Sequence, residues 1–284
     1  MGEQSRNVIV SGAARGIGRS LSRHFLDKGD RVFLLDIQED ELKYCVDVHL
    51  KQHADRAAYG VCDLRDPESI RQAIKKAALF FGGRIDVLVN NGGIAAPQWR
   101  DGKTMEDPDT LAEWQAYMET NLTAPFVTSQ ACLPFMKRDE IVATDAGAEA
   151  LASNIESTPG PCIVHIGSFR AHQSDPNQEG YAASKAGQLG LMHSMAISLA
   201  RWGIRVNLVA PGRIKAAHEC REGDEAGDGA GWANQVAGKD VADHPTNRAG
   251  RPRDVAQAVE YLVGAGFVTG EELTVDGGAL KKKN

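Results

Sequence analysis

A short glycine-rich loop near the start of the chain constrains its fold more than any other feature. The loop SGAARGIG, residues 11–18, follows an apolar strand at residues 7–10 and opens a helical run. Gly12 permits a tight turn, Gly16 lets a ligand approach the backbone, and Gly18 lets the helix pack on the strand. A structural turn would look similar, but a strand before and a helix after are the context that a phosphate cradle requires.

Apolar strand-like runs then alternate with helical runs along the chain, which predicts a parallel sheet in an α/β fold. The further strands are expected at residues 31–35, 57–62, 85–89, 162–167, 204–209 and 272–275. At 284 residues, the chain is long enough for residues 1–284 to form one large domain. Two polar segments interrupt the alternation. We expect a surface insertion at 139–160 and a substrate lid at 213–248, although disorder is an alternative for 222–231.

Aspartates and glycines follow the expected strands. Asp36 lies near the spacing of about 20 residues expected for an acid that binds the adenosine ribose. Because its carboxylate would repel a 2′-phosphate, NAD is favoured over NADP, although Arg15 could pair with that phosphate. Asp63 could reach an adenine amino group, and Gly93 could permit close approach of a ligand. Each of these residues would also suit a plain turn.

Three polar residues around residues 162–185 suit proton transfer. Ser168 follows a buried strand, and Tyr181 and Lys185 lie four residues apart, on one face of a helix. A tyrosine pKa of about 10 is too high for a good base, but a nearby ammonium lowers it. Tyr181 could then exchange a proton with a substrate oxygen that Ser168 holds. Taken alone, the pair is better explained by a partly buried tyrosine and a surface lysine, because residue pairs at this spacing are common.

A local irregularity is expected within the helical stretch 110–137. The ring of Pro125 opposes the carbonyl of Asn121, which lies four residues before it. Asn121 therefore marks either a kink that frees a carbonyl for water or an ordinary solvent-facing position.

Composition excludes several partners. The net charge of −6 and the pI near 5.8 argue against nucleic acid and anionic membranes. The five cysteines are scattered, which favours buried thiols in a reducing, cytoplasmic setting over disulfides or a metal site. The polar N-terminus does not fit a signal peptide, and no apolar run reaches membrane-spanning length.

Together, these motifs resemble the short-chain dehydrogenase/reductase family from residue 7 to residue 278. The resemblance is carried by SGAARGIG at 11–18, NNGG at 90–93, Asn121, Ser168, YAASK at 181–185, PG at 211–212 and VTGEELTVDGG at 268–278. Two small departures are Ser11, where threonine is usual, and Gly92, where alanine is usual.

The resemblance implies a single doubly wound Rossmann domain with a seven-stranded parallel sheet, NAD(P) and no metal. It implies a tetrad in which Tyr181 is the acid/base and Ser168 positions the substrate oxygen. Lys185 lowers the pKa of Tyr181 and binds the nicotinamide ribose, and Asn121 holds a water in a proton relay. The implied cofactor contacts are Gly12, Arg15, Gly16, Ile17, Gly18, Asp36, Asp63, Leu64, Asn91, Gly93, Tyr181, Lys185, Pro211, Gly212 and Ile214. A homo-oligomer, tetramer or dimer, is expected, with the helix of Gly187 and Gly190 as a candidate interface.

The leading function is hydride transfer between NAD(P) and a secondary alcohol or ketone. The alternatives are a catalytically silent dinucleotide sensor or scaffold and a non-redox lyase, dehalogenase or epimerase on the same fold. A complete tetrad argues against a catalytically silent protein, and the glycine loop with Lys185 argues against a dehalogenase. The substrate is left open: Ile94, Phe169, Trp232 and His244 would suit an apolar or ring-shaped one, and Arg170, His172 and Gln173 a polyol, sugar or acid.

Overall fold

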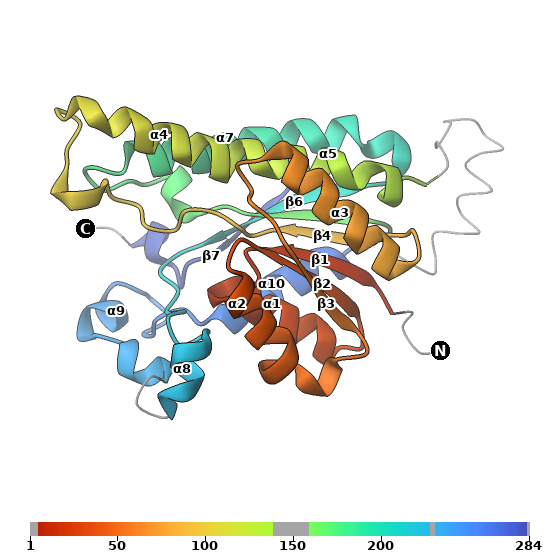
Figure 1. Cartoon of the computed structure of the whole chain (residues 1–284). Helices are drawn as coiled ribbons and strands as arrows, with labels where there is room; N and C mark the ends of the chain where they lie inside the picture. The colour runs from red at the N-terminus through yellow and green to blue at the C-terminus, as the bar shows by residue number, and fades with distance from the viewer. Residues whose placement is uncertain (1–4, 139–158, 228–230, 283–284) are drawn as a thin grey trace.

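The computed structural model describes residues 5–138, 159–227 and 231–282 (Figure 1). Within these ranges, seven parallel strands form one sheet in the order β3-β2-β1-β4-β5-β6-β7. The strands are β1 (Asn7–Ser11), β2 (Arg31–Asp36), β3 (Ala57–Val61), β4 (Val87–Asn90), β5 (Cys162–Ile166), β6 (Arg205–Pro211) and β7 (Glu272–Val275). The predicted seven-stranded parallel sheet is confirmed. The insertion expected at 139–160 lies almost wholly outside the described residues.

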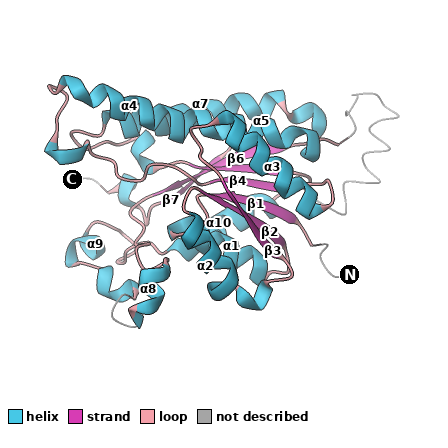
Figure 2. Cartoon of the chain, in the orientation of Figure 1, coloured by secondary structure: helices cyan, strands magenta, loops and turns pink. Residues whose placement is uncertain are grey.

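Helices cover both faces of the sheet, so that the fold has three layers (Figure 2). In Figure 1, α1, α2 and α10 lie on one face, and α3, α4, α5 and α7 lie on the other. The helices are α1 (Gly16–Asp27), α2 (Glu39–Tyr44), α3 (Pro67–Phe81), α4 (Leu111–Tyr117), α5 (Ala124–Met136), α7 (Glu179–Ser198), α8 (Arg221–Glu225), α9 (Gly238–Ala242) and α10 (Pro252–Gly264). This is the doubly wound arrangement that the alternation of strands and helices predicts.

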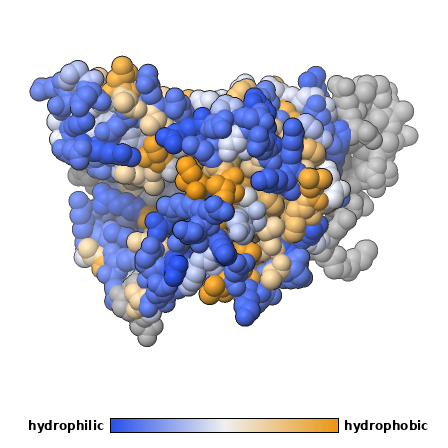
Figure 3. Space-filling model, viewed as in Figure 1, coloured by the Kyte–Doolittle hydropathy of each residue, from blue (hydrophilic) through white to orange (hydrophobic). Residues whose placement is uncertain are grey.

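The strands read as continuous apolar runs because both faces of the sheet are buried. Successive residues of β1 point to opposite faces, and they accordingly belong to different hydrophobic clusters. Val8 and Val10 pack with α1 and α10 residues such as Leu21 and Val259, whereas Ile9 packs with α3 residues such as Ile74. The outer surface is more polar: the face in Figure 3 is largely hydrophilic, with apolar residues gathered near its middle. Among the described helices, none is both long and apolar enough to cross a membrane.

The helix interrupted at Asn121 shows the expected irregularity. A π-helical turn, Met118–Thr123, separates α4 from α5. In a regular helix the Asn121 carbonyl would accept a hydrogen bond from residue 125, but Pro125 has no N–H. The chain therefore leaves this buried carbonyl to a donor from outside the helix.

The segment between β6 and α10 contains more regular structure than its polar sequence suggests. The helix α8 occupies part of the stretch for which disorder was an alternative, and α9 follows it. A parallel bridge pairs Ile214 with Gly250, so both ends of the segment lie together. Residues 228–230 lie outside the described part of the chain.

A buried arginine holds the end of α10 against the sheet, and we expect its loss to destabilise the fold. Only 6% of Arg205 is exposed. Its guanidinium donates to the carbonyls of Pro159, Leu262, Val263, Ala265 and Val268. Because Arg205→Met leaves buried carbonyls without a donor, the free energy of unfolding should fall by roughly 2–4 kcal/mol. Denaturant titration measures this loss of stability, with Arg71→Met at an exposed position of α3 as the control. Equal stability of the two variants would contradict the expected loss.

Candidate active site

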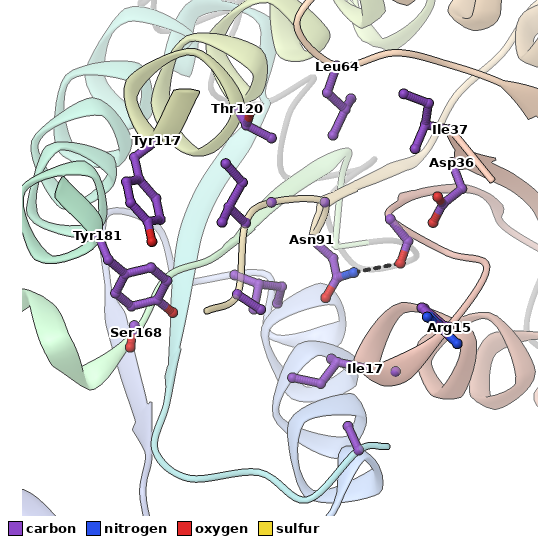
Figure 4. Close-up of a pocket in the computed structure, with 18 of the residues that line it drawn as sticks. Arg15, Ile17, Asp36, Ile37, Leu64, Asn91, Tyr117, Thr120, Ser168 and Tyr181 are labelled. Atoms are coloured by element: carbon purple, nitrogen blue, oxygen red, sulfur yellow. Dashed lines mark hydrogen bonds between the residues drawn. The ribbon is translucent and has the colours of Figure 1, made fainter. Parts of the chain in front are cut away.

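The candidate site lies at the carboxyl ends of the strands, where the sheet order reverses between β1 and β4. Open parallel sheets bind ligands at such a switch point. A cleft of about 1090 Å³ opens there, lined by loops that follow β1 to β6, by α4 and by the first two turns of α7 (Figure 4). Its volume is at the upper end of the range of about 300–1,000 Å³ found for small-molecule pockets. The cleft can therefore hold an extended ligand.

The glycine loop forms one wall of the cleft and has no room for a side chain at Gly12 or Gly18. Gly12 and Gly16 have φ angles of +62° and +61°, which favour glycine. A Cβ on Gly12 would lie 2.5 Å from the Cα of Gly92, and one on Gly18 would lie 2.0 Å from the Gly12 carbonyl oxygen. The Gly16 N–H donates to the Glu219 carbonyl at 2.7 Å, so a phosphate cradle here would use the other backbone N–H groups at the start of α1.

The loops after β1 and β4 are bonded to each other. The Asn91 amide donates to the carbonyls of Ser11 and Gly12 at 3.0 Å each. The Ser11 hydroxyl accepts from the backbone N–H groups of Asn91 and Gly92 at 3.1 and 3.0 Å. Ser11 supplies the hydroxyl that this junction uses, and Gly92 gives space to Leu64, whose Cδ1 would lie 2.4 Å from an added Cβ. Both departures from the family motifs therefore fit the local packing.

The adenosine end of the cleft carries a fixed carboxylate. Asp36 accepts from the backbone N–H of Ala14 and of Gln38, each at 3.1 Å. Arg15 pairs with Glu222 at 3.1 Å across the mouth of the glycine loop. The carboxylate of Asp63 pairs with Arg65 at 3.0 Å, and this hydrogen bond lowers the pKa of Asp63.

The structure gathers the sequence-predicted cofactor residues around this one cleft, except Gly18, which is buried under the loop. Those that line it are Gly12, Arg15, Gly16, Ile17, Asp36, Asp63, Leu64, Asn91, Gly93, Tyr181, Lys185, Pro211, Gly212 and Ile214. The set combines a glycine cradle, an acid after β2 and apolar side chains, and it fits a dinucleotide.

Tyr181 and Ser168 meet at the other end of the cleft (Figure 4). Ser168 follows β5, and its hydroxyl accepts from the Arg170 N–H at 3.2 Å. Burial raises the pKa of the Tyr181 phenol, while its hydrogen bond with Ser168 and the charge of Arg170 oppose this shift. Burial is thus the largest influence on the pKa of Tyr181, and a lowering by Lys185 stays a prediction.

Lys185 is a buried cation. It is 6% exposed, and its Nζ donates to the Ile166 carbonyl at 2.9 Å. Burial lowers the pKa of Lys185 to about 8, so the ammonium form still prevails at neutral pH. Its Nζ lies 5.7 Å from the centroid of the Tyr181 ring.

Asn121 acts beside the cleft rather than within its lining. Its side-chain oxygen accepts from the Ile94 N–H at 2.8 Å, and its amide donates to the Ile94 carbonyl at 3.3 Å and to the Ser184 hydroxyl at 3.2 Å. These bonds hold the loop after β4 against α7. Of the four tetrad residues, Ser168, Tyr181 and Lys185 thus line the cleft, while Asn121 supports it.

Tyr117 is a cleft residue that the sequence analysis missed. Its ring meets that of Tyr181 edge to face at 6.1 Å, and its hydroxyl donates to the Ala96 carbonyl at 2.7 Å. Gly180 gives it room, since an added Cβ would lie 2.7 Å from both the Tyr117 and the Trp99 rings. The available signal was its position four residues before Asn121, which is one helical turn.

The residues proposed to shape a substrate pocket divide into two groups. Ile94 lines the cleft, and Phe169 and Arg170 line an adjoining recess of about 510 Å³ that reaches Ser168 and Tyr181. The remaining residues line neither cavity; they are His172, Gln173, Trp232 and His244. Trp232 donates to the Gly250 carbonyl at 3.1 Å, and His172 pairs with Glu272 at 2.7 Å. Their chain position after strand ends was a poor guide, because these local partners hold them elsewhere.

The cysteines are buried, as the sequence analysis expects. All five cysteines are buried free thiols. Within the described ranges, no group of three or more histidine, cysteine, aspartate or glutamate side chains is arranged to hold a metal ion.

Fold and site together define a class: a Rossmann-type protein with a dinucleotide cleft that ends at a Ser-Tyr-Lys group. The family model described as enoyl-(acyl carrier protein) reductase matches residues 12–279. The chain belongs to the short-chain dehydrogenase/reductase family. It is accordingly an oxidoreductase that acts on alcohol or carbonyl groups with NAD(P).

Relatives differ in substrate and cofactor. A 3-oxoacyl-(acyl-carrier-protein) reductase FabG of Vibrio cholerae is 32% identical over 280 residues, covering 98% of each chain. A 7α-hydroxysteroid dehydrogenase complexed with NADH and 7-oxo glycochenodeoxycholic acid has 27% identity and a TM-score of 0.76, covering 100% of this chain and 97% of its own. ElxO with NADP bound has 25% identity and a TM-score of 0.75, covering 98% and 100%.

Proposed function

We propose that the protein transfers a hydride between NAD and a secondary alcohol or ketone, with Tyr181 as the acid/base. The observation that carries this proposal is the Tyr181–Ser168 pair, which lies in the same cleft as the glycine cradle and Asp36. Bound NAD would supply the carbon that accepts or gives the hydride. The protein's own residues then have to hold the substrate oxygen and move one proton.

Each side chain has a distinct task in this proposal. Ser168 and Tyr181 bind the substrate oxygen, and Tyr181 takes its proton during oxidation or returns it during reduction. Lys185 uses two donors within the protein and directs its remaining N–H to the nicotinamide ribose. Gly212 and Ile214 line the cleft beside Tyr181 and would confine the nicotinamide ring.

The charges at the adenosine end support NAD over NADP. The carboxylate of Asp36 is fixed by two backbone N–H groups, and Arg15 is engaged by Glu222. A 2′-phosphate would be repelled by the Asp36 carboxylate and would have to compete with Glu222 for Arg15. The same loop geometry, however, would accept NADP once the carboxylate is removed.

Asp36→Ala is therefore expected to change cofactor preference. The ratio of kcat/KM for NAD to kcat/KM for NADP should fall by roughly 10–100-fold, because one like-charge contact is removed and the ribose hydroxyls lose an acceptor. Initial rates with each cofactor measure this ratio. Asp40→Ala, an exposed acid on α2, is the matched control. A preference for NADP in the unmodified protein would contradict the assignment of NAD.

We extend the proposal to domain, lid and assembly. One domain would carry the whole site, and residues 213–248 would act as the substrate lid, since Ile214 and Ala217 line the cleft. The protein would form a homo-oligomer, tetramer or dimer. Gly187 is needed within the chain, where an added Cβ would lie 2.7 Å from Leu122, whereas Gly190 faces open space and remains available for a partner helix. Light scattering after size exclusion tests the assembly.

The experiment that tests the function is a ketone panel with NADH, followed by loss of nicotinamide absorbance. Neutral ring ketones, sugar-type carbonyls and 3-oxoacyl thioesters cover the chemistries of the relatives. We expect turnover with at least one class. Binding of NADH without turnover of any class would instead support a silent dinucleotide sensor.

A further inference from the structure

A buried glutamine on α7 connects two parts of the site that the proposed function treats separately. Gln188 lies three residues after Lys185, about one helical turn further along, and is 1% exposed. A glutamine amide offers both a donor and an acceptor, so burial requires partners for each. The partners of Gln188 are a freed backbone carbonyl and the buried lysine.

The side-chain N–H of Gln188 supplies a hydrogen-bond donor to the interrupted helix. Its Nε2 donates to the carbonyl oxygen of Asn121 in a short contact. This is the carbonyl to which Pro125, four residues further on, has no N–H to donate. Because Asn121 is fully buried, its carbonyl needs this donor, and the π-helical turn is thereby tied to α7.

The acceptor side of Gln188 faces the buried cation. Lys185 Nζ donates to Gln188 Oε1 at 3.4 Å and to the Ile166 carbonyl at 2.9 Å. Both acceptors are neutral, and the ion pairs found among the described residues do not include Lys185. The Gln188 amide dipole is thus one of two groups that stabilise this ammonium and fix its direction.

We propose that Gln188 is a positioning residue for catalysis: it clamps the Lys185 ammonium to the Asn121 carbonyl and sets the field that Lys185 exerts on Tyr181. The inference rests on the proposed function for its catalytic part. The Asn121 carbonyl has a second lone pair, so the water that was expected there stays a prediction.

The test compares two variants with opposite expected effects. Both variants lose the N–H that donates to the Asn121 carbonyl, so their comparison isolates the acceptor side. Gln188→Met keeps the length of the side chain and removes the acceptor, so the ammonium is destabilised. Gln188→Glu supplies a carboxylate, so the ammonium is stabilised. The free energy of unfolding, measured against pH, should begin its alkaline rise about one pH unit lower in Gln188→Met and higher in Gln188→Glu than in the unmodified protein. This readout needs no substrate and stays valid if the proposed reaction is wrong.

The second readout is the pH dependence of kcat for alcohol oxidation. In Gln188→Met, the acid limb should move to higher pH, because Tyr181 loses cationic support, and kcat near pH 7 should fall roughly tenfold. Met192→Leu, a fully buried change one turn further along α7, controls for altered packing and should move neither curve. Unfolding curves that do not separate the two Gln188 variants would overturn the clamp. Separated unfolding curves with unchanged kcat profiles would overturn its catalytic role.

Discussion

Tyr181→Phe is expected to lower kcat by roughly 10³-fold while the protein still folds and binds NADH. The change removes only the phenolic oxygen, which is the group that exchanges a proton with the substrate, and general acid–base catalysis of this kind contributes about 10²–10⁴-fold. The ring would keep its edge-to-face contact with Tyr117. The glycine cradle and Asp36 lie at the far end of the cleft, so affinity for NADH should change less than about threefold.

The control for this variant is Tyr261→Phe, which removes an exposed hydroxyl from α10. It should retain the full kcat. Initial rates with the best substrate of the panel and fluorescence titration with NADH give the two quantities. A Tyr181→Phe enzyme with more than about a tenth of normal kcat would show that another group carries the proton.

Lys185→Met is expected to have two opposite effects: lower activity and higher stability. Activity should fall by roughly 10²-fold or more, because Tyr181 loses the adjacent ammonium and the nicotinamide ribose loses a donor. Stability at pH 7 should rise, since burial lowers the pKa of Lys185 from 10.5 to about 8. That shift corresponds to a cost of about 3 kcal/mol for keeping the charge buried at pH 7. The lost hydrogen bonds reduce the expected gain to about 1–2 kcal/mol.

The pH dependence separates this explanation from improved packing. Between pH 8 and 10.5, the unfolded chain binds more protons at this lysine than the folded one, so the free energy of unfolding rises with pH. Below about pH 8, the full cost is present. Lys185→Met should lack this rise in the free energy of unfolding, whereas Lys76→Met, at an exposed position of α3, should keep it. A Lys185→Met protein that is less stable than the unmodified one at pH 7 would contradict the view of Lys185 as a buried cation without a carboxylate partner.

Much of the fold was predictable because its signals are local. Strands buried on both faces read as apolar runs, and β5 is an example in which every residue is buried. The start of α3 follows from Asp66 and Pro67: the Asp66 side chain accepts from the Glu68 N–H at 2.9 Å, as an N-cap should. The cleft could also be predicted, since parallel strands bring residues such as Asp36 and Ser168 to one edge of the sheet.

The parts that could not be predicted depend on contacts between distant segments. Gln188 reads as one more helical residue until the carbonyl freed by Pro125 is placed opposite it. His244 was expected in the pocket but is buried, with its ring nitrogen bonded to the Asp240 carbonyl. The pKa of Tyr181 depends on how deeply its phenol is buried, and the spacing of residues along the chain does not reveal that depth.

The most direct test of the account is a crystal structure with NADH and an unreactive ketone bound. We predict that the pyrophosphate lies on the glycine loop and that the nicotinamide lies beside Ile214. The ketone oxygen should lie within about 3 Å of both the Tyr181 and the Ser168 hydroxyls. A ketone oxygen that is bound away from Tyr181, or a nicotinamide outside the cleft between Gly12 and Tyr181, would contradict the central claim.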